Sequence, residues 1–296
     1  MKRFHTLIGI ILSLTLMTLI SGCGGGGTTT SSSTGEVVLK LTDAPIDDEN
    51  VKGVYVTFTA LRYQYADSND SWQDIDLNES RTIDLLTLQD GNTTLLNQVE
   101  LPAGEIAHVR FVLDLDNCYI TFNDDTNTSL ELEVPSGAQT GYKAIGGFTI
   151  PAGGTVNVTA DFDVRKSVTA TGNGRYKLNP TIKIIDNIEV GEINGTMTLD
   201  ANGSKVIVYA YTDGSFDESE SNATNNFGNS VLSTDATDGS YILPWLTTGV
   251  YDLIVVATDT TGVFENILGY INDVTVETGV TTPQDITDDT LEDALL

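Results

Sequence analysis

Apolar and polar residues alternate along most of the chain from Glu36 onward, and this period of two is the strongest constraint on its fold. In Thr155 to Val164 every second residue is apolar, namely Val156, Val158, Ala160, Phe162 and Val164. Such alternation is typical of a β-strand with one buried face. Clusters of Gly, Asn, Asp and Pro separate the runs, which favours antiparallel strands joined by turns. The sequence therefore predicts an all-β protein, with helix limited to a short turn at Leu85 to Gln89 and the C-terminal tail.

The composition narrows the classes of function. The 296 residues include 42 acidic and 14 basic side chains, a formal net charge of −28. A nucleic-acid-binding protein needs a basic surface for its phosphate contacts, so this charge argues against that class of partner. Hydrophobic residues make up 40% of the chain, more than a disordered acidic chain carries, which predicts packed cores. Two cysteines are too few for a disulfide scaffold.

A change in charge near Glu189 to Glu192 predicts a domain boundary. Basic residues occur up to Lys183, but Lys205 is the single basic residue from Glu192 to the end. We therefore expect two antiparallel β-sandwich-type domains, at residues 36–188 and 192–286. The acidic tail at 287–296 follows them, and its early acids favour a short helix.

The N-terminus has the pattern of an exported lipoprotein. Lys2 and Arg3 precede an apolar run from Leu7 to Ile20, which is short for a membrane-spanning helix. The run ends in Leu-Ile-Ser-Gly-Cys at residues 19–23, which resembles the lipobox of bacterial lipoproteins. This resemblance implies a signal peptide at 1–22, lipidation of Cys23, and a membrane partner held through the lipid. A cleaved signal peptide with an incidental cysteine is the alternative.

The residues after Cys23 indicate a tether and a location. The expected tether is the segment 23–35, in which Cys23 is followed by four glycines and a Thr/Ser run. This composition favours a flexible linker over a packed core. Gly24 stands where an inner-membrane retention signal in Gram-negative bacteria usually places Asp. We therefore expect a lipid-anchored protein of the cell envelope, at the outer rather than the inner membrane, on the periplasmic or the surface side.

Several spaced motifs in the first domain resemble a known family. The motifs are LKLTDAPIDD at 39–48, IDLLTLQDG at 83–91, LPAG at 101–104 and LNPTIK at 178–183. Together they resemble the domain of unknown function 4382 family, which is common in exported lipoproteins. The resemblance implies a location and an architecture, and no activity comes with it.

The second domain is similar to a different family. TDGSYIL at 237–243 and LTTGVYDLIVVA at 246–257 are similar to the carboxypeptidase regulatory-like domains, which are small transthyretin-like β-sandwiches. In these domains a DG turn begins one strand and a G-x-Y turn begins the next. The resemblance implies an accessory role, and no zinc-peptidase domain accompanies it in this sequence.

Few residues offer catalytic chemistry, and we expect no catalytic residue. After loss of the signal peptide, His108 is the single histidine, which argues against Ser-His-Asp and Cys-His catalysis. We expect His108 to be solvated on a strand, on the same face as Arg110. Cys118 is expected to be a small buried hydrophobic residue, and Trp72 a core residue.

The acidic loops provide the candidates for a metal site. Asp213, Asp217 and Glu220 lie in an insertion rich in Asp, Glu, Ser and Asn, and carboxylate oxygens are the ligands that calcium prefers. Calcium is therefore the one cofactor we consider. Solvated loop charge is the alternative, because no acidic segment matches the twelve-residue EF-hand loop.

Aromatic residues provide the candidates for ligand binding. If Val206, Val208 and Ala210 face the core, then Tyr209 and Tyr211 lie on the outer face of the same strand, where tyrosines can stack on sugars or a partner. Burial under the insertion at 213–229 explains the two tyrosines equally well. Trp245, next to Pro244, is a third candidate.

We therefore expect a non-enzymatic, membrane-anchored envelope lipoprotein with a binding or structural role, whose ligand is a glycan or an envelope protein. Two alternatives stay open. One is a polysaccharide-directed hydrolase or its accessory subunit, acting through Asp and Glu. The other is a calcium-dependent adhesion protein.

Overall fold

The computed structural model of this chain describes residues 33–295, except 44–49, 69–70, 125, 127, 136–139, 200, 202, 223–226 and 260. Residues Ser33–Leu296 form one compact unit. The expected signal peptide, Cys23 and nearly all of the expected tether lie outside the described residues. Among the residues with described structure, no helix is long and apolar enough to cross a membrane.

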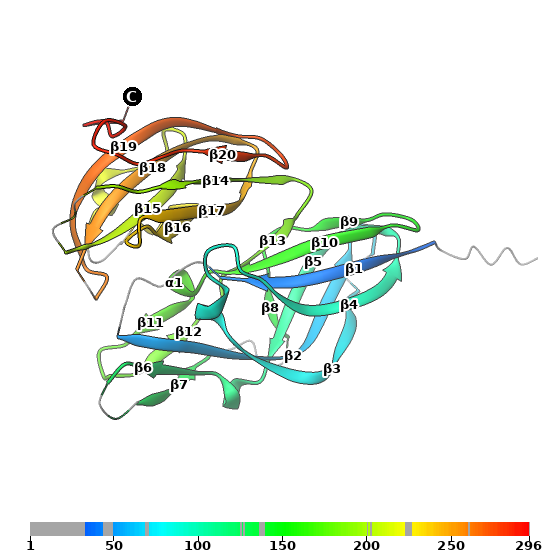
Figure 1. The fold of residues 1–296 in the computed structure, drawn as a ribbon. Helices are drawn as coiled ribbons and strands as arrows, with labels where there is room; N and C mark the ends of the chain where they lie inside the picture. Colours follow the sequence, from blue (N-terminus) through cyan, green and yellow to red (C-terminus); the bar gives the residue numbers. More distant parts are fainter. Residues whose placement is uncertain are drawn as a thin grey trace, which may run out of the picture. The chain divides into compact units, whose positions relative to one another are not determined.

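The first β region, residues 34–186, has two sheets that share one hydrophobic core (Figure 1). In spatial order, the four-stranded sheet consists of β13 (Ile182–Asp186), β10 (Thr155–Phe162), β1 (Thr34–Thr42) and β4 (Thr94–Pro102). The nine-stranded sheet consists of β11 (Val168–Ala170), β12 (Tyr176–Leu178), β7 (Ser129–Glu133), β6 (Tyr119–Phe122), β2 (Val51–Tyr65), β5 (Gly104–Leu113) and β8 (Tyr142–Lys143), with β3 (Gln73–Asp84) on β2 and β9 (Phe148–Ile150) on β5.

Strand β1 lies inside the four-stranded sheet, where alternate residues are buried as the sequence predicts. Val37, Leu39 and Leu41 are buried in the core, while the residues between them are partly exposed. From the nine-stranded sheet, Phe58 and Phe111 enter the same core with their rings edge to face. Burying these large side chains is the main favourable term in the stability of the region.

The second β region, residues 190–286, also has two sheets, drawn in yellow-green to red in Figure 1. The three-stranded sheet consists of β17 (Ser240–Thr247), β14 (Val190–Thr196) and β20 (Thr281–Pro283), and the four-stranded sheet of β16 (Leu232–Asp235), β15 (Lys205–Thr212), β18 (Gly249–Thr258) and β19 (Phe264–Val276). Val206, Val208 and Ala210 of β15 lie in the core of this region, as predicted. The protein is all-β, and the division into two separate domains at 36–188 and 192–286 stays a prediction.

Three strand pairs differ from the expected antiparallel pattern. The pairs β1–β10, β12–β7 and β14–β20 are parallel. Turn residues indicate which strands are joined by tight turns, whereas parallel strands need a long crossover connection. Local sequence patterns therefore could not reveal these three pairings.

Helical structure in the described chain is short. It comprises 3₁₀ turns at Leu85–Leu88, Leu115–Asn117 and Glu218–Glu220, and the single turn α1 at Val164–Ser167. The first of these confirms the turn predicted at Leu85 to Gln89. Strand β10 ends at Phe162, earlier than the alternating pattern predicts, because the Asp163 side chain accepts a hydrogen bond from the Lys166 amide and caps α1.

The short helix expected in the tail at 287–296 is absent from its described residues, and that expectation is wrong. The backbone of Glu292 instead exchanges two hydrogen bonds with Tyr270 of β19, at 2.8 and 3.0 Å. Leu291 packs over Gly269, where a Cβ atom would lie 2.9 Å from the leucine side chain. The tail is therefore held by pairing and packing against β19, which outweigh its weak helix propensity.

Helix α1 connects to the loop that precedes β16. The Arg165 guanidinium donates to the Phe227 carbonyl at 3.2 Å and to the Ser230 hydroxyl at 2.7 Å. Lys166 donates to the Ser230 carbonyl at 2.8 Å, and the Arg165 guanidinium lies 5.3 Å from the centre of the Tyr209 ring. Charged donors thus satisfy carbonyl groups of this loop.

Asp161, near the end of β10, is expected to make stability depend on pH. Burial and, to a smaller extent, the nearby Asp163 raise the pKa of its carboxyl to about 7, although Lys183, Lys166 and Arg165 oppose the rise. Its Oδ1 atom is shielded from solvent and has no hydrogen-bond partner within the described part of the chain. The cost of burying the charged form therefore exceeds the attraction of the neighbouring cations.

Between about pH 4 and pH 7 the folded protein holds a proton on Asp161 that the unfolded chain has released. The contribution of Asp161 to the free energy of unfolding therefore falls as pH rises through this window and levels off above it. Asp161→Asn is expected to gain stability over wild type on going from pH 5 to pH 8, measured by urea unfolding. Asp76→Asn, on the exposed part of β3, is the matched control. An equal pH dependence in wild type and Asp161→Asn would contradict the assignment.

Candidate functional site

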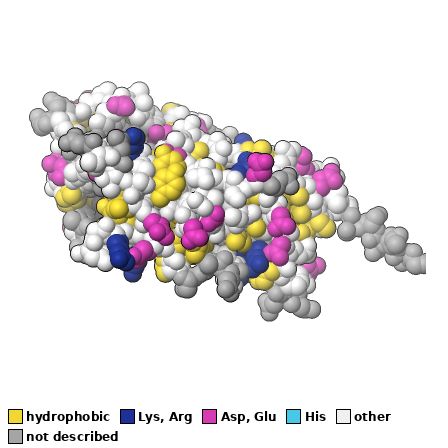
Figure 2. Space-filling view, turned by 90° about the horizontal axis from the view of Figure 1, so that it is seen from below, with side chains coloured by type: hydrophobic (Ala, Val, Ile, Leu, Met, Phe, Trp, Pro, Cys, Tyr) yellow, Lys and Arg dark blue, Asp and Glu magenta, His cyan; other side chains and the backbone are white. Residues whose placement is uncertain are grey.

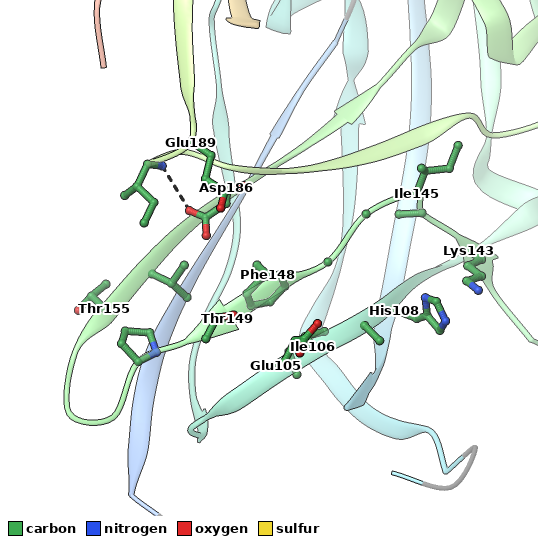
Figure 3. Close-up of a pocket in the computed structure, with 17 residues that line it drawn as sticks. Glu105, Ile106, His108, Lys143, Ile145, Phe148, Thr149, Thr155, Asp186 and Glu189 are labelled. Atoms are coloured by element: carbon green, nitrogen blue, oxygen red, sulfur yellow. Dashed lines mark hydrogen bonds between the residues drawn. The ribbon is translucent and has the colours of Figure 1, made fainter. Parts of the chain in front are cut away.

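A groove of about 1020 Å³ runs along one side of the first β region (Figure 3). Strand β5 forms one wall and the turn at 186–189, after β13, forms the other. The floor is the segment 143–149, which runs from the last residue of β8 to the first two residues of β9. Three segments far apart in the sequence therefore build the groove.

The floor is held by backbone hydrogen bonds to both sheets. The Ala144 amide donates to the Val109 carbonyl of β5 at 2.9 Å, and the Ile145 amide donates to the Ile182 carbonyl of β13 at 2.8 Å. At Gly147 a Cβ atom would lie 2.2 Å from the Ile106 carbonyl oxygen, closer than any real contact. Glycine is therefore required where the chain crosses from one sheet to the other.

The groove has apolar side chains along it and opposite charges at its ends. Ile145 and Ile188 are 70% and 71% exposed, the highest values among the described large hydrophobic residues that are exposed. His108 and Lys143 lie at one end, and Asp186 with Glu189 at the other (Figure 3). Asp186 also orders its own turn, because its Oδ1 accepts the Ile188 amide at 3.3 Å.

Trp72 lies next to the basic end of the groove, on the outer face of the sheet. The Arg110 guanidinium is 4.1 Å from the centre of its ring, and the His108 ring stacks on it at 6.3 Å with an interplanar angle of 23°. The tryptophan is half-buried, so the expectation that it is a core residue is wrong. His108 does share a face with Arg110, as predicted, and its ring is covered on one side by Trp72.

Cys118 is fully buried, as predicted, and its thiol donates to the Asp114 carbonyl at 3.2 Å. Burial raises the pKa of the thiol. A thiol that stays protonated and out of solvent is a poor nucleophile.

Tyr209 and Tyr211 are completely buried, so they do not form the exposed ligand-binding stripe that was one expectation. The Tyr209 ring stacks on Phe227 at 4.3 Å, and Phe216 contacts Tyr211 edge to face. Both phenylalanines lie in or at the end of the insertion at 213–229. The alternative interpretation, burial under this insertion, is therefore correct.

Glu220, one of the three expected calcium ligands, is buried and forms hydrogen bonds within the protein. Its carboxylate accepts the Tyr211 hydroxyl, the Asn229 amide and the Asn229 side chain, each at 2.9 Å. Asp217 caps the 3₁₀ turn by accepting the Ser219 amide, which lowers the pKa of its carboxyl, and Asp213 is exposed. Over the described part of the chain, no group of three or more His, Cys, Asp or Glu residues could hold a metal ion. The calcium site stays a prediction without support from this arrangement.

Trp245, the remaining expected ligand-binding residue, lines a smaller hollow of about 390 Å³ with Asp90 and Glu192. Its backbone has a φ of +60°, which is rare for a large side chain. Its indole Nε1 is shielded from solvent without a partner among the described residues. A role of Trp245 in binding stays a prediction.

The sequence interpretation missed most of the groove. Ile145, Ile188 and Lys143 could not be predicted as neighbours of one groove, because the turns that carry them are distant in sequence. The pair Gly146-Gly147 was the available signal, since two adjacent glycines after a strand often indicate a close approach of two backbones.

Replacing Glu220 tests the structural role of the buried carboxylate. Glu220→Gln is expected to lower the free energy of unfolding by about 1–3 kcal/mol, because the amide nitrogen must face a donor and one buried bond is lost. Thermal and urea unfolding measure this change, and Glu218→Gln on the same turn, which is exposed, is the matched control. A specific calcium-dependent rise in Tm that Glu220→Gln abolishes would contradict the internal role and favour the metal site.

Comparisons with known proteins find one family whose model matches the first β region. No curated protein matches this chain. Among solved structures, a leucine-rich repeat protein from Bacteroides thetaiotaomicron shares 13% identity over 89% of this chain and 27% of its own length, with a TM-score of 0.20. The minor pilin of Streptococcus agalactiae shares 12% identity over 85% and 94% of the two chains, with a TM-score of 0.19. A fimbrial protein from Bacteroides ovatus shares 11% over 87% and 50%, with a TM-score of 0.22.

This chain spans about a quarter of the first of these proteins, and none of the three alignments superimposes closely enough to carry an argument about function. The sequence profile of one family, in contrast, matches a defined segment. The segment includes strands β5, β8 and β9 of the groove and ends before β13. The model of the family described as domain of unknown function DUF4382 matches residues 34–180, the part of the chain whose motifs predict this resemblance.

Proposed function

We propose that this chain is a non-enzymatic lipoprotein of the cell envelope that binds a glycan chain in the groove of its first β region. In this proposal the acylated Cys23 is the membrane anchor, and the Gly/Thr/Ser segment after it is the tether. The observation that carries the binding role is the exposure of Ile145 and Ile188 along one groove. Exposed apolar side chains that line one groove commonly mark an interaction site.

The backbone of the groove favours a glycan over an extended peptide. A peptide usually binds a sheet by adding a strand to a free edge. Here the amides of Ala144 and Ile145 already donate to β5 and β13. A sugar ring needs no strand edge, because its apolar face packs on aliphatic or aromatic side chains while its hydroxyls bond polar groups at the rim, such as Thr149 and Thr155.

The second β region acts in this proposal as an accessory sandwich of the carboxypeptidase regulatory-like kind. The Asp238-Gly239 turn that begins β17 supports this assignment, since Gly239 has the positive φ of +86° that such a turn needs. Tyr241 and Leu243 then point into the core of the region.

The anchor is tested with the full-length chain expressed in a bacterial host that processes lipoproteins. Wild type is expected to incorporate a labelled fatty acid and to partition into the detergent phase on Triton X-114 extraction. Cys23→Ser is expected to lose both properties, because serine lacks the thiol that is acylated. Fatty-acid labelling that persists in Cys23→Ser, or a wild type without label, would contradict the anchor.

The groove is tested with the compact unit Ser33–Leu296 and immobilised bacterial and plant polysaccharides, by affinity electrophoresis. Ile145→Asp is expected to weaken binding by about tenfold or more. It removes apolar area that the bound sugar would cover, and it adds a charge that would have to lose its water on binding. Val263→Asp is the control, since Val263 is 46% exposed and lies outside the groove.

Two results would contradict this proposal. Equal retardation of wild type and Ile145→Asp, with both folded by circular dichroism, would show that the groove does not bind. Release of reducing ends from a bound polysaccharide, lost in Asp186→Asn or Glu189→Gln, would show that the protein is a hydrolase.

A further inference from the structure

Three basic side chains lie in register across neighbouring strands next to the groove. Arg62 of β2 pairs directly with Arg110 of β5, and Arg110 pairs directly with Lys143 of β8. Strands in a sheet are about 4.8 Å apart, so the three residues form a line with steps of about that length. We call Arg62, Arg110 and Lys143 the basic row.

The basic row lies on the face of the sheet that is turned away from the core. Leu61 and Phe111, the neighbours of Arg62 and Arg110 along their strands, are buried in the core. Successive side chains of a strand point to opposite faces, so the two arginines point outward. His108 stands two residues before Arg110 and shares this face.

Trp72 holds the centre of the row in place. The Arg110 guanidinium lies 4.1 Å from the centre of the indole, a distance at which cation and ring attract each other. The Arg110 Nη1 also donates to the Thr140 carbonyl at 3.3 Å. Its Nε is shielded and has no hydrogen-bond partner in the described segments. The guanidinium is therefore oriented before any ligand arrives.

Positive charge in the row is only partly neutralised. Arg62 forms an ion pair with Asp74 at 2.7 Å. Lys143 is exposed, and no salt bridge to it occurs among the described residues. The rest of the chain is strongly acidic, and Figure 2 shows Asp and Glu side chains spread over one face with Lys and Arg in a few separate places.

We propose that the basic row, with Arg110 held in place by Trp72, binds the anionic groups of an acidic polysaccharide, whose sugar chain continues into the groove. This rests on the proposed function, because His108 and Lys143 belong both to this surface and to the lining of the groove. A guanidinium held by a ring can donate to a carboxylate or a sulfate, and an exposed ammonium adds a second charge. The step of the row is comparable to the length of one sugar ring.

The geometry favours an acidic polysaccharide over an anionic membrane. A bilayer is a broad anionic surface, and a chain with a net charge of −28 would be repelled from it at most points of contact. A single polysaccharide chain can instead follow a line of cations on one sheet. Half-buried Trp72 lies against this line instead of projecting from it.

The test uses the compact unit Ser33–Leu296 with three soluble polymers: polygalacturonate, dextran sulfate and neutral dextran. We expect one or both acidic polymers to bind at low salt, with an affinity that falls as salt is added, and neutral dextran to bind more weakly. Lys143→Glu is expected to weaken binding of the acidic polymer by about tenfold and to reduce the salt slope by roughly one. Trp72→Ala is expected to weaken it as well, with thermal melting as a check on its fold.

Lys177→Glu is the matched control, because Lys177 is exposed on β12 of the same sheet and outside the row. Equal effects of Lys143→Glu and Lys177→Glu would show that only net charge matters and would overturn the basic row. Binding of neutral dextran as strong as that of the acidic polymers, lost in Ile145→Asp but not in Lys143→Glu, would overturn the row and leave the groove standing.

Two further outcomes would overturn the acidic-polysaccharide proposal. Absence of binding to either acidic polymer at low salt would overturn the proposal for the row, while the polysaccharide panel decides the groove separately. Tighter binding to phosphatidylglycerol vesicles than to both acidic polymers would show that the row contacts a membrane and would overturn the polysaccharide assignment.

Discussion

The form of the first β region depends on the backbone crossing at Ala144 to Gly147. Within two residues the chain changes its hydrogen-bonding partner from β5 in one sheet to β13 in the other. Two glycines follow, because a side chain at Gly147 would collide with the Ile106 carbonyl. With the backbone of Ile145 held on β13, its side chain is left pointing to solvent, and the depression beside it becomes the groove. A constraint on backbone hydrogen bonds thus produces an exposed apolar surface that hydrophobic burial alone would remove.

Most strands could be predicted from the sequence, and most strand partners could not. Alternation reports which face of a strand is buried. It identified β10 at Thr155–Phe162 and the core residues of β15. It carries no information on which distant strand pairs with it, so the parallel pairing of β1 with β10 had no local signal. The groove and the basic row both arise from such pairings. Their residues could therefore be recognised only when the register was known.

Alternation also could not predict the burial of Tyr209 and Tyr211, because it does not show what covers each face of a strand. The period of two placed Tyr209 and Tyr211 on the face of β15 opposite the core, which is where they lie. Whether that face is solvated depends on the insertion, whose Phe216 and Phe227 pack over it and whose Glu220 accepts the Tyr211 hydroxyl. Glu220 stands in a run of acidic residues, so its sequence context resembles that of an exposed loop. A buried acid among exposed acids is distinguishable only through its hydrogen-bond partners.

The uneven distribution of charge gives the basic row a selectivity that three cations on a neutral protein would lack. An acidic polymer is repelled by most of a surface with a net charge of −28, so non-specific contacts contribute little and the favourable contact is confined to the row. Within the row, Asp74 already neutralises Arg62, which leaves Arg110 and Lys143 as the charges a ligand can use. Trp72 lies 4.1 Å from the Arg110 guanidinium, so a ligand must approach this group from a side that the indole leaves free. His108 lies on the same face of the sheet, next to Trp72, and also lines the groove. A polymer bound to Arg110 and Lys143 can therefore continue past His108 into the groove.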